Sequence, residues 1–365
     1  MALTRIQPPA IADVREPNFR NIIINGDMAV SQRATSAASV ATQQYPAVDR
    51  FQFGLAGTMG TWTFSQDTDV PTGQGFANSF KMDCTTADAS PAAADAIRIA
   101  QIIEGQNLQY LKKGTSSAVP LTLSFWVKSV LTGTYIAELY DVDNTRQVSK
   151  SYTISSASTW EYKTITFPAD TTGAFTNDNN ASLYLNFFVG AGTDYTSGSL
   201  NTSWAAVTNA NRAVGQVNLA NSTSNNFWIT GIQMEAGSVA TDFEVNTFAQ
   251  NLERCQRYYT RWQGDASDQR SIANGMVVGT AQVRMIVVYP TTLRTFPTVT
   301  ESALETLDSG KSVEAVSLNG TVDPGINAVN AQIDADSGTP YTVGQAISLR
   351  TSSSTSSYFA VDAEL

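Results

Sequence analysis

Histidine is absent from the 365-residue sequence, and cysteine occurs only twice. Without imidazole the chain has no Ser-His-Asp or Cys-His nucleophile system, no histidine zinc ligand and no ordinary proton shuttle near pH 7. The two cysteines, Cys84 and Cys255, cannot close a zinc site or a disulfide framework. Both lie in apolar patterns, so we expect small, buried side chains there. Paired carboxylates, as in glycoside hydrolysis, are the acid–base chemistry that this composition still allows.

Charged residues are also scarce, at 15% of the chain, against roughly 25% in an ordinary soluble domain. Ser, Thr, Asn, Gly and Ala take their place, a composition typical of extracellular and viral β-proteins. The net charge of −10 disfavours nucleic acid and anionic membranes as partners, because both attract a basic surface. No apolar run approaches a membrane span, and the N-terminus lacks a signal-peptide hydrophobic region, so we expect synthesis in a cytoplasm.

The chain does contain a long series of strand-like segments. From residue 21 to 245, short β-branched and aromatic runs alternate with clusters of Gly, Asn, Asp and Ser, which predicts an antiparallel jelly-roll sandwich. The run NIIINGD, residues 21–27, predicts the first buried strand, ending in an Asn-Gly turn. In FWITGIQMEAG, residues 227–237, Gly231 predicts a β-bulge.

Three other segments have a different character. Residues 1–20 carry three prolines without periodicity and predict an extended arm. The polar stretch from Ala191 to Asn226 predicts a functional or mobile loop, with binding or contact among its roles. Residues 264–365 predict a smaller C-terminal β-domain, or else strands that complete the first sandwich.

Between the two β-regions the apolar period becomes helical. Residues 246–263 predict a linking helix, with a capping box that starts at Thr247. We expect Arg254, Arg257 and Arg261 on its outward side. The apolar seam is the candidate subunit-contact surface and consists of Phe248, Leu252, Cys255, Tyr259 and Trp262. The seam fits two arrangements equally well, a helix lying on its own sheet or copies of the helix meeting around a symmetry axis.

Three strand segments suggest a binding face opposite the core. In LTLSFWVKS, residues 121–129, the apolar residues point one way and Trp126 points the other. In TYIAELYD and SLYLNFFVG, aromatic, carboxylate and amide groups likewise oppose the core side. Aromatic rings stack on the C–H faces of sugars, and fixed polar groups bind their hydroxyls. The candidate glycan-binding residues are Trp126, Glu138, Tyr140, Tyr184 and Asn186, with packing or subunit contact as the alternative role of this face.

A few acidic positions offer hard oxygen ligands that suit calcium. They are Glu235 and the acidic turns that begin at Asp141 and Asp334. None has the full spacing of a known calcium loop. We therefore predict no metal and no cofactor, with a structural calcium ion as an open alternative.

Six segments in the same order resemble a family of bacteriophage virion proteins: NIIINGDMAVSQR, YPAVDRFQF, LTLSFWVKS, FWITGIQMEAGSVATDFE, LERCQRYY and YFAVDAEL. The family comprises tail-fibre and tail-associated proteins, most familiar from marine and cyanobacterial phages. Their central part is similar to jelly-roll carbohydrate-binding modules. The resemblance covers the chain from about residue 20 onward. It implies a virion component, usually oligomeric and often trimeric, on or near the apparatus that meets the host cell, and no fixed position on the particle. Together with the candidate binding face, it leads us to predict a non-enzymatic, homotrimeric tail fibre that attaches to host-surface glycan.

Two other functions stay open at this point. One is a tail adaptor, or a capsid head-fibre or decoration protein, with no receptor role. In either case residues 1–20 could dock in a groove of other virion tail proteins and order on binding. The second is a glycan depolymerase with paired carboxylates, although the sequence lacks the repeats of a parallel β-helix.

Overall fold

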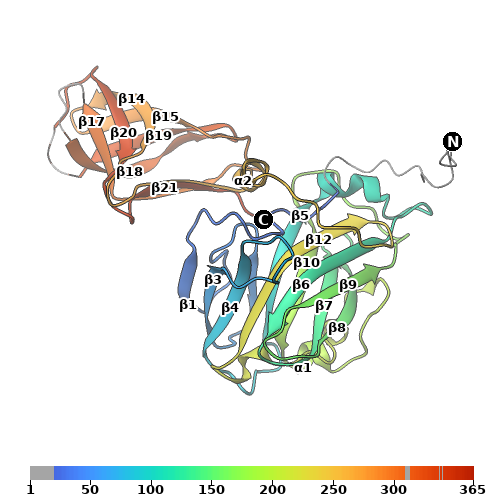
Figure 1. Ribbon diagram of the computed structural model, residues 1–365. Coiled ribbons are helices and arrows are strands. Elements are labelled where there is room, and N and C mark those ends of the chain that lie inside the picture. The colour runs from blue at the N-terminus through green and yellow to red at the C-terminus, as the bar shows by residue number, and fades with distance from the viewer. Residues whose placement is uncertain (1–19, 309–312, 337, 339) are drawn as a thin grey trace, which may run out of the picture.

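The computed structural model describes residues 20–308, 313–336, 338 and 340–365, so all but the last residue of the arm predicted at residues 1–20 lies outside the described residues. Antiparallel sheets form a sandwich, helices are few and short, and six strands close a C-terminal barrel. Figure 1 shows the barrel as a separate body, connected to the sandwich through a short helix. The predicted all-β fold class is confirmed.

The sandwich consists of two six-stranded sheets, called sheet A and sheet B here. Sheet A has the order β1-β3-β4-β12-β6-β9, with bounds β1 Ser36–Val40, β3 Thr61–Asp67, β4 Ser79–Thr86, β6 Leu121–Ser129, β9 Glu161–Phe167 and β12 Asn226–Ala236. Sheet B has the order β11-β8-β7-β10-β5-β2, with bounds β2 Gln52–Ala56, β5 Ala96–Glu104, β7 Gly133–Asp141, β8 Arg146–Ile154, β10 Ala181–Ala191 and β11 Ala205–Ala206. Because β12 inserts between β4 and β6, the last strand of the sandwich joins its early and middle parts.

Alternating side chains fill the space between the sheets. The sides predicted to face the core are buried: Leu123, Phe125 and Val127 in β6, and Leu185 and Phe187 in β10. The rings of Phe125 and Phe187 meet with centroids 5.0 Å apart at 72°. Such edge-to-face pairs add about 0.5–1.5 kcal/mol beyond their area burial. Cys84 and Cys255 are also buried and free, as predicted.

The run at residues 21–27 is largely buried, but the prediction that it forms the first strand is wrong. Asn25 adopts a φ angle of 61°, which breaks an extended backbone. Its side-chain amide donates to the carbonyl of Val30 and accepts from the Val30 N–H. A side chain therefore supplies the hydrogen bonds that a neighbouring strand would otherwise provide.

The β-bulge predicted at Gly231 is confirmed, since the register of β12 against β6 shifts there and Gly231 has a φ angle of 61°. The side chain of Asn21 occupies the gap in the ladder. It donates to the carbonyl of Ile232 and accepts from the N–H of Met234, each at 3.0 Å. A Cβ at Gly231 would come within 2.6 Å of the Phe76 ring, so the glycine lets that ring lie against the strand.

The polar stretch from Ala191 to Asn226 packs in part on the outer side of sheet B, whereas Leu219 and Ala220 near its end join the core of the sandwich. It contains the short helices α1 Thr193–Thr196, η3 Asn209–Asn211 and η4 Leu219–Asn221. Gln216 accepts the backbone N–H of Ile136 in β7 at 2.8 Å. The Trp204 indole donates to the carbonyl of Pro168 at 2.8 Å. Ala213 also packs against Ile136 and Phe188, so this part of the stretch covers the outer side of sheet B.

The linking helix α2 spans Phe248–Gln256, shorter than the predicted 246–263, and begins with the capping box predicted at Thr247. Tyr259 and Trp262 lie instead in strand β13, Tyr259–Gln263, which pairs with the C-terminal strand β21, Tyr358–Asp362. The prediction of one helical seam through all five residues is therefore wrong beyond Gln256. Among the described residues, no helix is both long and apolar enough to cross a membrane.

Helix α2 lies on its own sandwich, the first of the two predicted arrangements. Cys255 is fully buried beside Ile24, and Leu252 packs against the same small cluster. Phe248, at the start of the helix, is 60% exposed. A contact between copies through these residues stays a prediction.

The three arginines predicted on the outward side of the helix turn toward the protein. Arg254 donates to the carbonyl of Asn21, Arg257 to the carboxylate of Glu104, and Arg261 to the carbonyl of Arg33. The expectation that they line the outward side is wrong, because these guanidinium groups bind oxygens at the edge of the sandwich.

After α2 the described strands pair only with each other, so they do not complete the sandwich. A three-stranded sheet has the order β13-β21-β16, with β16 at Thr298–Ser302. The barrel has the order β14-β15-β19-β18-β17-β20, with bounds β14 Ser271–Gly279, β15 Gln282–Val288, β17 Leu304–Asp308, β18 Val313–Pro324, β19 Ala328–Ala335 and β20 Ala346–Thr351. Beyond β21 the chain returns to the sandwich, where Tyr45 donates to a Leu365 oxygen at 3.0 Å.

Candidate functional site

The five residues predicted to bind glycan lie on two opposite faces of the sandwich. Trp126 is on the outer face of sheet A, whereas Glu138, Tyr140, Tyr184 and Asn186 are on the outer face of sheet B. The expectation of one shared face is wrong. Alternation within a strand tells which side faces the core, but β6 and β7, although consecutive, belong to different sheets.

On sheet B the four side chains form two cross-strand pairs, Tyr140 opposite Tyr184 and Glu138 opposite Asn186. Glu138 is 0% and Asn186 1% exposed. The Asn186 amide donates to the Glu138 carboxylate at 2.8 Å. Arg212, from the covering stretch, donates two N–H groups to the same carboxylate at 2.7 and 2.8 Å. Asn186 and Arg212 therefore already occupy the carboxylate of Glu138, the acidic group of this face.

Arg212 also occupies the space above the rings of this face. Its guanidinium carbon lies 5.1 Å from the ring centroid of Tyr140 and 5.7 Å from that of Tyr195. Burial alone would lower the pKa of Arg212, but the hydrogen bonds from Arg212 to Glu138 and the negative charge of Glu138, with smaller contributions from Tyr195 and Tyr140, together raise the pKa. The pair is a closed structural element, in which loss of one partner would leave a buried charge.

The outer face of sheet A, in contrast, is hollowed beside Trp126. A cavity of about 470 Å³ lies there, within the roughly 300–1,000 Å³ typical of small-molecule sites. Aromatic rings, an amide, a hydroxyl and two carboxylates line it. The side chains that line it include those of Trp126, Tyr162, Phe76, Phe243, Gln74, Ser124, Asp27 and Asp242.

Neighbouring strands place the two largest rings of the cavity side by side. Trp126 in β6 is directly opposite Tyr162 in β9, with ring centroids 5.2 Å apart at 45°. Because Ile165 and Phe167 face the core, the alternation of β9 turns Tyr162 outward. Tyr162 is 45% exposed and Trp126 is half-buried. Both rings therefore present a face to solvent while the sheet holds them in place.

Loop residues build the facing wall of the cavity. Phe76 lies over the glycine of the β12 bulge and meets Phe243 edge to face, with centroids 5.1 Å apart at 76°. Gln74 and Ser124 add an amide and a hydroxyl to the lining. Together they give the mixture of flat apolar surface and fixed polar groups that sugar rings require.

The two carboxylates of the cavity differ in their surroundings. Burial raises the pKa of Asp27, against hydrogen bonds from backbone groups and from Asn251. The Asn251 amide of α2 lies 3.0 and 3.2 Å from its two carboxylate oxygens. Asp27 thus ties α2 to the sandwich beneath the cavity, while Asp242 comes from the loop that follows β12.

Two further indole rings extend this face of sheet A. Trp228 in β12 and Trp160 just before β9 flank Lys128, whose ammonium lies 4.2 and 5.4 Å from their ring centroids. Lys128 and Trp160 both bind the carboxylate of Asp69. These contacts fix the rings before any ligand arrives, which reduces the entropy lost on binding.

Sequence reasoning selected Trp126 for this face and missed its neighbours. Tyr162 could have been found, because WEYKTITF alternates and its tyrosine falls on the side opposite Ile165. Phe76 and Phe243 lie in loops far apart in the sequence. No local pattern indicates that they meet.

Each acidic position considered for calcium has protein partners instead. Glu235 accepts from Gln233, Asp141 lies 2.5 Å from the ammonium of Lys113, and Asp334 accepts an amide hydrogen bond. In the part of the chain that the structure describes, no group of three or more Asp, Glu or Cys side chains could hold a metal ion.

No protein-family model and no curated protein matches the sequence. Among solved structures, the chain is similar to the enzymatically active domain of bacteriophage CBA120 tailspike protein 4, at 16% identity and a TM-score of 0.32, covering 60% of this chain and 22% of that one. It is similar to a Bacteroides thetaiotaomicron protein described as sugar-binding, at 12% identity and a TM-score of 0.31, covering 59% and 99%. It is also similar to a C-terminal family 22 carbohydrate-binding module of Clostridium thermocellum, at 8% identity and a TM-score of 0.30, covering 62% and 98%. The chain thus has a distant structural similarity to carbohydrate-binding modules and to a phage tailspike domain.

Proposed function

We propose that this protein binds glycan through the outer face of sheet A. The observation that carries the proposal is the partly exposed Trp126–Tyr162 pair, set in a cavity that Gln74, Ser124 and Asp242 also line. The rings would stack on the C–H faces of a sugar. The amide, hydroxyl and carboxylate would bind its hydroxyl groups.

We further propose that the glycan belongs to a bacterial surface and that the protein is a tail fibre of a phage virion. The six-segment resemblance supports this role, and so does a surface rich in hydroxyl and amide groups. In this proposal the protein is a homotrimer, residues 1–20 attach it to other tail proteins, and the sandwich and the barrel are exposed to the host.

The proposed action is binding without hydrolysis. Two carboxylates line the cavity, and a glycosidase would need such a pair. Asp27, however, has both oxygens engaged by Asn251, a structural role. We expect no reducing ends to be released from a bound polysaccharide. Release that disappears in Asp242→Asn would reassign the protein to the depolymerases.

A microarray of bacterial surface polysaccharides tests the binding proposal directly. We expect the wild-type protein to bind a restricted set of glycans and Trp126→Ala to lose them. Phe296→Ala is the matched control, because Phe296 is an aromatic residue 67% exposed outside the sandwich. Equal binding by wild type and Trp126→Ala would reject this face as the site.

Immunogold electron microscopy of phage particles, with antibody to residues 265–365, tests where on the virion this protein lies. Label at the distal ends of tail appendages is expected for a receptor-binding fibre. Label on the head or at the upper collar would instead favour the decoration or adaptor alternative.

A further inference from the structure

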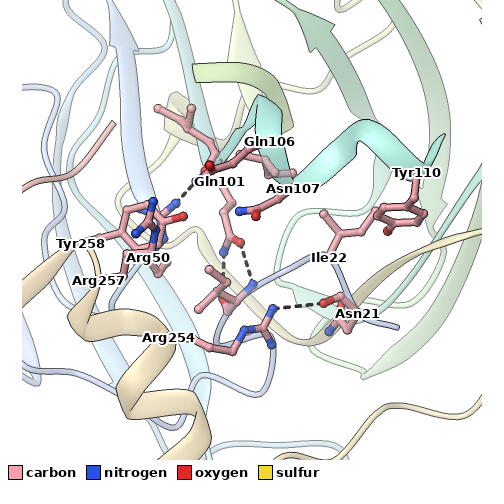
Figure 2. Close-up of a pocket in the computed structure, with 13 residues that line it drawn as sticks. Asn21, Ile22, Arg50, Gln101, Gln106, Asn107, Tyr110, Arg254, Arg257 and Tyr258 are labelled. Carbon is pink, nitrogen blue, oxygen red and sulfur yellow. Dashed lines mark hydrogen bonds between the residues drawn. The ribbon is translucent and has the colours of Figure 1, made fainter. Parts of the chain in front are cut away.

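A second cavity, of about 480 Å³, lies where sheet B, residues 21–24 and helix α2 meet. Figure 2 shows Arg50, Arg257 and Tyr258 on one side of it and Ile22 and Tyr110 on the other. The cavity is distinct from the one beside Trp126, and no residue lines both. Its volume again falls in the range of small-molecule sites.

The lining of this second cavity is cationic in an acidic protein. Three arginines, Arg50, Arg254 and Arg257, contribute to it, and none of its lining residues is an aspartate or glutamate. The chain as a whole carries a net charge of −10. Behind the lining, Arg257 pairs with Glu104 at 2.8 Å and Arg50 pairs with Glu364. The charged side chains among the lining residues are therefore all guanidinium groups, and the carboxylates lie outside the lining.

Arg50 gives a second, independent indication that this cavity suits an anionic ligand. It is 1% exposed, and its Nη2 donates to the carbonyl of Ile102 at 2.6 Å. Its Nε is buried and has no hydrogen-bond partner among the described residues. A buried guanidinium N–H without an acceptor is costly, and an anionic oxygen in the cavity would satisfy it.

The remaining wall offers groups that suit a sugar rather than a bare ion. The short helix η2, Gly105–Leu111, presents the amides of Gln106 and Asn107 and the ring of Tyr110, all exposed. In Figure 2 these amides lie between Tyr110 and the arginine side of the cavity. A ligand with hydroxyls along one edge and a carboxylate at one end would match this order.

We propose that this cavity binds an acidic saccharide. Its carboxylate would accept from the guanidinium groups of Arg254 and Arg50, a charge-assisted contact roughly twice as strong as a neutral hydrogen bond. Its hydroxyls would bind Gln106 and Asn107, and one ring face would lie on Tyr110. This site goes beyond the glycan-binding face of sheet A, and either site could exist without the other.

Isothermal titration of the full chain with D-glucuronate and D-galacturonate tests this proposal, with D-glucose, D-galactose and sulfate as comparison ligands. We expect a uronate to bind and the neutral sugars to give no heat. Arg254→Gln should weaken uronate binding roughly 10–100-fold, through loss of the charged hydrogen bond. Tyr110→Ala should weaken it roughly 3–10-fold.

The variants also separate the two sites. Trp126→Ala should keep its uronate affinity, even where it has lost glycans on the array. Because Arg254 also donates to the carbonyl of Asn21, circular dichroism must show that Arg254→Gln folds. If Arg254→Gln does not fold, the uronate affinity of Tyr110→Ala decides whether the proposal stands. Absence of uronate binding, unchanged affinity in the folded variants, or sulfate binding as tight as uronate binding would each overturn the proposal.

Discussion

The two outer faces of the sandwich carry similar kinds of side chain and use them differently. On sheet B, Glu138 and Asn186 are buried under Arg212, which the chain supplies from its own covering stretch. On sheet A, Trp126 and Tyr162 border a cavity of about 470 Å³. An outward face that mixes aromatic and polar groups is therefore a candidate binding surface only where the protein's own loops leave it open.

The largest effect is expected from opening the closed face. Glu138→Ala would leave the guanidinium of Arg212 without its carboxylate in a buried site. We expect it to reduce the free energy of unfolding by about 3–5 kcal/mol, measured by urea denaturation. Glu253→Ala, at an exposed position on α2, is the control and should change stability little. A similar small change in both variants would show that Arg212 does not close sheet B.

The next largest effect is expected on the open face. Trp126→Ala should cost about 2 kcal/mol of glycan-binding free energy, the size of an interface hot spot, or about 30-fold in affinity. Its free energy of unfolding should fall less than that of Glu138→Ala, because Trp126 is only half-buried. Titration with the strongest glycan of the array measures the first quantity and urea denaturation the second. If Trp126→Ala lost stability and kept its glycan affinity, the outer face of sheet A would be structural and would not be the glycan-binding face.

Acid should lower the free energy of unfolding through protonation of Glu104, which lies at the end of β5 in sheet B. Burial alone would raise the pKa of Glu104, but hydrogen bonds from Arg257 and Tyr258 outweigh it and hold the pKa below its ordinary value of 4.5. The unfolded state therefore takes up this proton more readily than the folded state. The stabilisation is present above pH 4.5 and is lost as pH falls through the lower folded-state pKa.

Glu104→Gln tests that pH dependence. At pH 7 we expect it to lose about 1.5 kcal/mol of stability, the value of a hydrogen bond to a charged group. The difference from wild type should narrow as pH falls below 4.5, as followed by thermal unfolding across pH 3–7. A constant difference at every pH would mean that the Glu104 charge does not contribute to folding.

The smallest effect is expected at Tyr184, a predicted glycan contact that lies on the covered face. Tyr184→Ala should change glycan affinity less than about twofold, well under the effect of a hot spot. The same titration used for Trp126→Ala measures it. An equal loss in both variants would show that glycan also reaches sheet B and would erase the contrast between the faces.

The sequence predicted those parts of the fold that depend on local alternation. LTLSFWVKS coincides with β6, and its inward side is the core, because a strand's period of two is visible within nine residues. The capping box at Thr247 and the bulge at Gly231 are local for the same reason.

The predictions that the structure contradicts share one cause, which is contact between parts of the chain that lie far apart in the sequence. Helix α2 ends at Gln256 because β13 pairs with β21, about one hundred residues later in the sequence. Residues 21–27 are not a strand because the side chains of Asn21 and Asn25 bind backbone groups elsewhere. The candidate site was found only in part, since Phe76 and Phe243 approach Trp126 from separate loops.

Hydrogen–deuterium exchange, with and without the strongest oligosaccharide from the array, tests the central claim most directly. If glycan binds the outer face of sheet A, exchange should slow in residues 74–76, 160–164 and 242–245, the segments around Trp126 and its cavity. Slowed exchange confined to residues 192–213, over sheet B, would contradict the account.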